Sequence, residues 1–272
     1  MKLGMVTYNM GKDMDLPALI ELCMAAGLEG VELRTTHAHG VETTLNKEQR
    51  ADVKRLVADS PIELAGLGSA FEYDSLDPDE VKSNIEGSIE YAQLAADVGA
   101  PGIKVRPNRL HVDEGVSIEA TAEQIGKAMR QVAVFAEGIG VEIRLEVHGS
   151  GTSDPKVVRQ IMDHADHPNA LVCWNSNRTD MDAEHSIDWS FDLLKDKIAV
   201  AHITDIGVYQ YPWQDLFTKL KSIDYQGFCL AEIQHNVDEA RFMKYYRTIF
   251  DLYTGRYQWP PDFPAGDIPD MG

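Results

Sequence analysis

Four residues with metal-binding side chains stand near the ends of four short, apolar, strand-like segments. The segments are LEVHG, CWNSN, AHITD and LAEIQ, and they contain Glu146, Asn175, His202 and Glu232. Two carboxylates, an amide and an imidazole together suit a divalent cation. Because buried acidic side chains require a counter-charge, these residues predict one metal site if the fold brings them together.

The spacing of these four residues indicates which fold would bring them together. Successive members are separated by 29, 27 and 30 residues. This is about the length of one strand-plus-helix unit, since a (β/α)₈ barrel divides roughly 250 residues among eight units. Side chains at the C-terminal ends of barrel strands face a common mouth. We therefore expect the four residues to form a ring at that mouth.

The rest of the chain contains the elements that such a ring needs. Amphipathic stretches with helix start signals, such as Asp77-Pro78 and Asp154-Pro155, separate the strand-like segments. Alternation of strand and helix predicts a parallel sheet, and eight units predict one closed (β/α)₈ TIM barrel. The eight strand-like runs lie near residues 2–9, 30–35, 62–69, 101–106, 141–147, 170–175, 198–204 and 228–233.

The barrel domain is expected to cover residues 1–256, followed by a proline-rich tail over 257–272. Four prolines follow Trp259, so the tail cannot form a helix. We expect it to lie on the barrel or on a neighbouring subunit of a homo-oligomer.

Composition and charge indicate which binding partners and which cellular compartment to expect. The formal net charge of −19 would repel phosphate backbones, so nucleic acid is not expected to bind. No apolar run approaches the length of a membrane helix, and the N-terminal segment has no signal-peptide pattern, so we expect a cytoplasmic protein. The three cysteines, Cys23, Cys173 and Cys229, lie far apart in apolar contexts, which predicts buried, reduced thiols without a catalytic role.

Strand alternation predicts further residues at the mouth. If Glu146 points inward, His148 does too, and the same rule turns Asn177 inward with Asn175. His148 could be a metal ligand, a partner of a ligand or a substrate contact, and we expect the last. Asn177 is also expected to bind substrate.

Basic residues collect at the same rim. Strand parity places Arg34, Lys104 and Arg106 there, and Arg178 follows Asn175 by three residues. Together these cations could bind an anionic or hydroxyl-rich substrate.

The charge of the substrate depends on whether nearby carboxylates neutralise these cations. Glu32 and Glu72 are the candidates. Pairing would favour a neutral sugar, whereas open, unpaired arginines would favour a phosphate or carboxylate. We lean to the neutral sugar, because no Gly-rich loop or helix start offers the backbone N–H groups that phosphate sites commonly use.

The whole chain resembles the xylose isomerase-like barrels, a family of sugar phosphate isomerases and epimerases. The resemblance lies in Glu of LEVHG, the polar residue of CWNSN, His of AHITD and Glu of LAEIQ. It implies one divalent cation (manganese, zinc, magnesium or cobalt) bound by Glu146, Asn175, His202 and Glu232. It also implies that Glu146 and Glu232 act as acid and base on opposite faces of a ketose.

The chain departs from the family pattern at two positions. Asn175 stands where the family has Asp, and Arg178 stands where many epimerases have His. The amide can still coordinate through its oxygen, but the lost negative charge should weaken metal binding. The trinuclear endonuclease IV branch of the superfamily does not fit, because it needs additional His and Asp ligands and residues 62–74 contain no histidine.

These features predict a metal-dependent isomerase or epimerase that transfers a proton next to the carbonyl of a sugar or keto-sugar. A lyase or dehydratase acting on a keto-sugar or inosose would share the metal site and the first step. A metal-free binding or scaffold subunit is the alternative from another class.

Overall fold

Each strand-like run of the sequence forms one strand of a closed parallel barrel, as predicted. The computed structural model describes residues 1–208 and 210–258. Neighbouring strands pair in chain order, and β1 pairs with β8 through Met5 and Ala231 to close the barrel. The strands are β1 (Lys2–Val6), β2 (Gly30–Arg34), β3 (Glu63–Glu72), β4 (Gly102–Arg106), β5 (Glu142–Glu146), β6 (Ala170–Asn175), β7 (Ile198–Ile203) and β8 (Phe228–Ala231).

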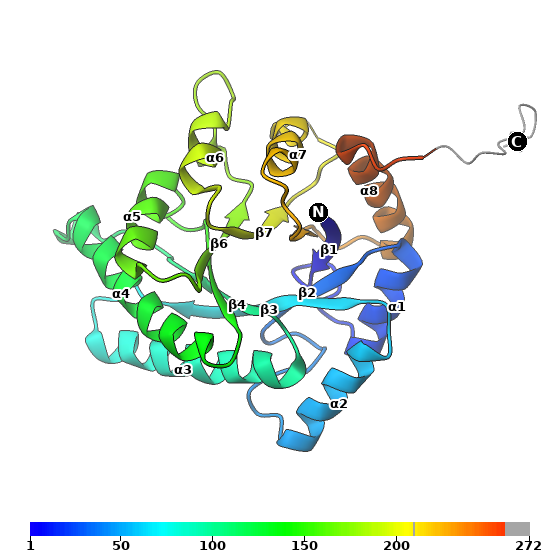
Figure 1. Cartoon of the computed structure of the whole chain (residues 1–272), viewed down its shortest axis with the longest axis horizontal. Helices are drawn as coiled ribbons and strands as arrows, with labels where there is room; N and C mark the ends of the chain where they lie inside the picture. The colour runs from blue at the N-terminus through cyan, green and yellow to red at the C-terminus, as the bar shows by residue number, and fades with distance from the viewer. Residues whose placement is uncertain (209, 259–272) are drawn as a thin grey trace, which may run out of the picture.

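Helices alternate with the strands and surround the barrel (Figure 1). Asp77 and Asp154 cap α3 and α5 as the sequence predicts, since each side chain accepts a hydrogen bond from a backbone N–H in the first turn. The helices are α1 (Leu16–Ala26), α2 (Lys47–Ala58), α3 (Pro78–Val98), α4 (Ile118–Glu137), α5 (Pro155–Ala165), α6 (Asp188–Leu194), α7 (Trp213–Ser222) and α8 (Glu239–Thr254). Two short 3₁₀ helices, η1 (Val112–Glu114) and η2 (Arg178–Asp180), lie in the loops after β4 and β6.

The core has two layers because side chains alternate along each strand. Outward side chains pack against the helices; Trp174, for example, contacts Phe191 with ring centroids 6.0 Å apart. A smaller apolar cluster includes Cys173, Val200 and Leu230, which share strand parity with the inward-facing residues of β6, β7 and β8. Polar side chains follow this cluster towards the C-terminal ends of the same strands.

A buried arginine shows how glycine makes room inside the barrel. Arg144 donates a hydrogen bond from Nη1 to the Ala65 carbonyl at 2.6 Å and also pairs with Glu142. A Cβ atom at position 102 would lie 2.6 Å from Arg144 Nε, so Gly102 is required for this close approach. The inward direction of Arg144 agrees with strand parity.

The sequence also led to expectations about the cysteines, membrane-spanning helices and the C-terminal tail. Cys23, Cys173 and Cys229 are buried and free, as predicted. In the described ranges, no helix is long and apolar enough to cross a membrane. The last helix ends at Thr254, and the tail predicted over 257–272 lies outside the described residues except for its first two positions.

Candidate active site

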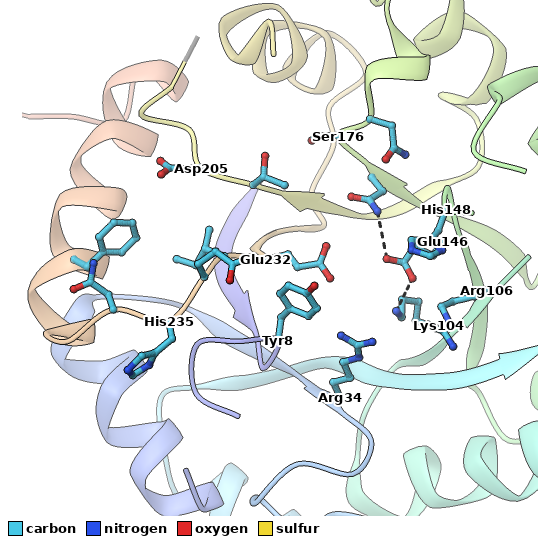
Figure 2. Close-up of a pocket in the computed structure, with 17 residues that line it drawn as sticks. Tyr8, Arg34, Lys104, Arg106, Glu146, His148, Ser176, Asp205, Glu232 and His235 are labelled. Atoms are coloured by element: carbon cyan, nitrogen blue, oxygen red, sulfur yellow. Dashed lines mark hydrogen bonds and ion pairs between the residues drawn. The ribbon is translucent and has the colours of Figure 1, made fainter. Parts of the chain in front are cut away.

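The loops at the C-terminal ends of the strands enclose a cavity of about 560 Å³. This volume is in the range of small-molecule sites. Figure 2 shows its side chains converging from many strands of the barrel. Of the residues predicted from the sequence, those that line it are Glu146, Asn175, Glu232, Arg34, Lys104, Arg106, His148 and Asn177.

The predicted metal ligands lie together. One ligand atom from each of Glu146, His202 and Glu232 lies within 4.8 Å of the others. His202 Nδ1 is 3.6 Å from Glu146 Oε1 and 3.7 Å from Glu232 Oε2. Asn175 donates from Nδ2 to the same Glu146 Oε1 at 3.3 Å, so the amide also lies beside this cluster.

The donor set fits a divalent cation. His202 Nδ1 is buried and has no hydrogen-bond partner in the described structure, while two carboxylates face it. Burial opposes a charge on His202, but Cys173, Glu32 and Glu146 beside it raise its pKa well above the usual value. The same negative surroundings would attract a metal ion, which needs neutral imidazole and ionised carboxylates as ligands.

Glu32 on β2 supports the histidine from its other side. Glu32 Oε1 lies 3.2 Å from His202 Nε2, and both side chains are fully buried. Burial would raise the pKa of Glu32, but His202, Lys104 and Arg144 lower it, so the carboxylate is ionised. A carboxylate at Nε2 fixes the orientation of the imidazole and leaves Nδ1 for a metal. From the sequence, Glu32 was expected only as a partner for the basic rim.

Lys104 holds one oxygen of Glu146. Its Nζ atom lies 2.6 Å from Glu146 Oε2, and both side chains are almost completely buried. Burial alone would raise the pKa of Glu146, but Lys104 and His202 hold it well below its ordinary value. Glu146 therefore presents Oε1 to Asn175 and His202 while Oε2 binds the ammonium group.

The remaining cations of the rim have different surroundings. Arg106 pairs with Glu72 at 2.5 Å, as the sequence analysis allowed. The Arg34 guanidinium lies over the Tyr8 ring, 5.1 Å from its centroid. Arg178 is exposed in η2 and is not among the described residues that line the cavity, because the chain turns away after β6.

The two other predicted substrate residues lie at the cavity wall. His148 has a buried Nδ1 without a hydrogen-bond partner in the described chain. Asn177 donates from its amide to the Val147 carbonyl, which ties the loop after β6 to the end of β5.

Some lining residues were not predicted as part of the site. Tyr8 follows Val6 of the interior cluster by two positions, so strand parity could have identified it. Gln234 accepts a hydrogen bond from Asn9 at 2.7 Å and links the loops after β8 and β1, a contact between distant segments that the sequence does not encode.

Comparisons with known proteins agree with this architecture. The family model described as "Xylose isomerase-like TIM barrel" matches residues 20–246. A search of curated proteins found no match.

Three solved structures illustrate the similarity in fold. D-psicose 3-epimerase from Clostridium cellulolyticum H10, solved with D-tagatose, is 16% identical with a TM-score of 0.77, covering 93% of this chain and 99% of that one. The IolI protein with a bound zinc atom is 16% identical with a TM-score of 0.74, covering 96% and 100%. The 3-keto-D-glucoside 4-epimerase YcjR from E. coli is 14% identical with a TM-score of 0.73, covering 94% and 99%.

Proposed function

The chain belongs to the xylose isomerase-like TIM barrel family, and from this premise we propose that it is a divalent-metal-dependent isomerase or epimerase. Its substrate would be a sugar or keto-sugar, and its reaction a proton transfer next to a carbonyl. The observation that carries the proposal is the cluster of Glu146, His202 and Glu232 beside a small-molecule cavity.

Glu146, Asn175, His202 and Glu232 would hold one cation: manganese, zinc, magnesium or cobalt. When bound, such a cation polarises a carbonyl and its neighbouring hydroxyl, which makes the C–H bond between them more acidic. Support comes from His202, whose buried ring nitrogens have no hydrogen-bond partner in the described chain, and from Glu32, whose carboxylate lies 3.2 Å from Nε2 behind the ring.

The two glutamates would move the proton. Glu232 accepts no hydrogen bond within the described chain and lines the cavity, so its carboxylate is free to approach a substrate C–H group. Glu146 would act as the second acid or base, and Lys104 fixes its position. His148, Arg106 and Asn177 line the cavity around them and would bind substrate hydroxyls. The Lys104 ammonium group, which lies beside Glu146, would donate a further hydrogen bond to the substrate.

The alternatives from the sequence receive less support. Two of the three structures compared above carry names that state an activity, and both are epimerases rather than lyases. A metal-free binding subunit likewise receives no support from these two names.

Hydrogen–deuterium exchange tests the shared first step. Purified protein, loaded with Mn²⁺, is incubated in deuterated water with a panel of ketoses, keto-sugars and their acidic and phosphorylated forms, and NMR follows exchange at the carbon next to the carbonyl. We expect metal-dependent exchange with at least one compound and none with the Glu232→Gln variant. Absence of exchange from the whole panel with folded, metal-loaded protein would contradict the proposal.

A further inference from the structure

The cations that line the cavity differ in whether the protein neutralises them. Lys104 pairs with Glu146 at 2.6 Å, and Arg106 pairs with Glu72 at 2.5 Å. Arg34 forms no ion pair and no side-chain hydrogen bond with any residue in the described ranges; its contact is the face of Tyr8. A guanidinium therefore remains available at the cavity wall.

The surroundings of Arg34 orient it for binding. The guanidinium of this half-buried residue lies over an aromatic ring, and Figure 2 shows it pointing into the cavity beside Tyr8. Stacking on a ring restricts the plane of the guanidinium and leaves its N–H donors at the edge. Two parallel N–H donors of a guanidinium match the paired oxygens of a carboxylate or phosphate better than a single hydroxyl group.

Arg34 adds positive charge to its surroundings although the whole chain is acidic. Burial lowers the pKa of His37, and electrostatic interactions with His39, Arg34 and Lys12 lower it further. No carboxylate in the described chain offsets the Arg34 charge by direct contact. A neutral sugar would give this guanidinium no direct ionic partner, whereas an anion would.

We propose that Arg34 and Tyr8 form an oxyanion subsite, so that the substrate carries a carboxylate or phosphate monoester away from its reacting carbonyl. This inference rests on the proposed function for the sugar part of the substrate. The proposed subsite replaces the expectation of a neutral sugar substrate, which was based on the absence of a Gly-rich phosphate loop from the sequence. A single arginine fork can recognise an oxyanion without such a loop.

Binding of a matched four-carbon series tests the subsite without requiring turnover. The ligands are erythritol, erythronate and erythritol 4-phosphate, which differ in one terminal group. Affinities are measured by calorimetry at low ionic strength with metal-free protein, so that a bound cation does not attract the anions. The proteins are wild type, Arg34→Gln and, as a matched control, Arg55→Gln on the exposed face of α2.

We expect wild-type protein to bind at least one of the charged ligands about tenfold or more tightly than erythritol, since a hydrogen bond between two charged groups is stronger than one to a neutral hydroxyl. Arg34→Gln should lose this preference, and Arg55→Gln should keep it. Preference for erythronate would identify a sugar acid, and preference for the phosphate ester a sugar phosphate.

Two results would overturn the subsite: equal or undetectable binding of both charged ligands relative to erythritol, or a preference that survives in Arg34→Gln. Either would leave the proposed proton transfer standing if neutral sugars still exchange deuterium. Conversely, an Arg34-dependent preference without exchange on any compound would support the subsite and contradict the proposed reaction.

Discussion

Glu146 and Glu232 share the candidate metal site but differ in their surroundings. Glu146 is buried and bound by Lys104 and Asn175, whereas Glu232 is partly exposed and its carboxylate is unpaired within the described chain except for the nearby His202. This difference favours Glu232 as the group that first contacts the substrate proton, and Glu146 as the more rigidly held partner.

We predict that Glu232→Gln damages catalysis more than His148→Ala. Loss of a general acid or base typically lowers the rate 10²- to 10⁴-fold, and Glu232 is also a proposed ligand. His148 lines the cavity without a hydrogen-bond partner for its buried Nδ1, which suits a substrate contact. Steady-state rates at saturating metal decide the matter; a more severe loss in the His148 variant would show that the roles are wrongly assigned.

We predict that Asn175→Asp tightens metal binding. The substitution replaces an amide beside Glu146 and His202 with a third carboxylate, which restores the charge that the family pattern includes. Calorimetric titration with Mn²⁺ measures the change. Asn177→Asp is the matched control, because it adds the same charge two residues further along the chain but its side chain contacts the Val147 carbonyl.

The control variant should gain less affinity than Asn175→Asp. Unchanged or weaker binding in Asn175→Asp would remove Asn175 from the set of ligands.

Strand alternation made most of these residues predictable from the sequence. It identified the inward positions of Arg34, Lys104, Arg106, Glu146 and Asn175, because the pleat is regular up to the end of each strand. Arg178 was placed at the rim only because it follows Asn175 by three residues, and η2 instead exposes it on the surface. Strand alternation could not show that Glu32 contacts His202 or that Lys104 contacts Glu146, since these pairs join strands distant in the sequence.

Among the elements, the loops after β6 and β7 are joined by a buried carboxylate. Asp180 of η2 accepts hydrogen bonds from Tyr211 Oη at 2.8 Å and from the Asn177 backbone N–H at 2.9 Å. Tyr211 Oη in turn accepts from Trp174 Nε1 at 3.2 Å. Burial raises the pKa of Asp180 to about 7, so its protonation state changes near neutral pH.

This contact predicts a pH-dependent contribution to stability. The ordinary pKa of Asp in an unfolded chain is about 3.9, so between pH about 4 and 7 the folded protein binds more protons than the unfolded protein. The free energy of unfolding should therefore fall as pH rises through this window, by up to about 4 kcal/mol for this group at about 1.4 kcal/mol per pKa unit.

Urea unfolding of wild type and Asp180→Asn at several pH values between 4 and 8 isolates this contribution. The asparagine does not titrate, but its oxygen can still accept from Tyr211 and Asn177. We expect the difference in stability to shift in favour of the variant as pH rises. A constant difference across the range would mean that Asp180 is not protonated in the folded protein.

The elements themselves were predicted more completely than their ends. Proline after a capping aspartate identified the starts of α3 and α5, and apolar runs identified all eight strands. The run expected over 2–9 ends as a strand at Val6, and β3 continues to Glu72. Strand ends depend on where a neighbouring strand stops offering hydrogen bonds, which sequence patterns do not specify.

At the scale of the whole molecule, the excess of acidic residues and the cations that line the cavity are separate features. The formal charge of −19 is spread over the chain, whereas Arg34, Lys104 and Arg106 come from β2 and β4. The carboxylates of Glu146 and Glu232 face them from β5 and the end of β8. The barrel therefore brings both signs of charge to one cavity, as a site for a cation and an oxygen-rich substrate requires.

Anomalous diffraction from a crystal soaked in Mn²⁺ tests the proposed metal site directly. We predict one peak in the cavity, within about 2.0–2.6 Å of oxygen or nitrogen atoms of Glu146, Asn175, His202 and Glu232, the range typical of hard-cation ligands. The peak should vanish in the His202→Ala variant soaked under the same conditions. A peak elsewhere in the barrel, or no peak in crystals of folded wild-type protein, would contradict the central claim.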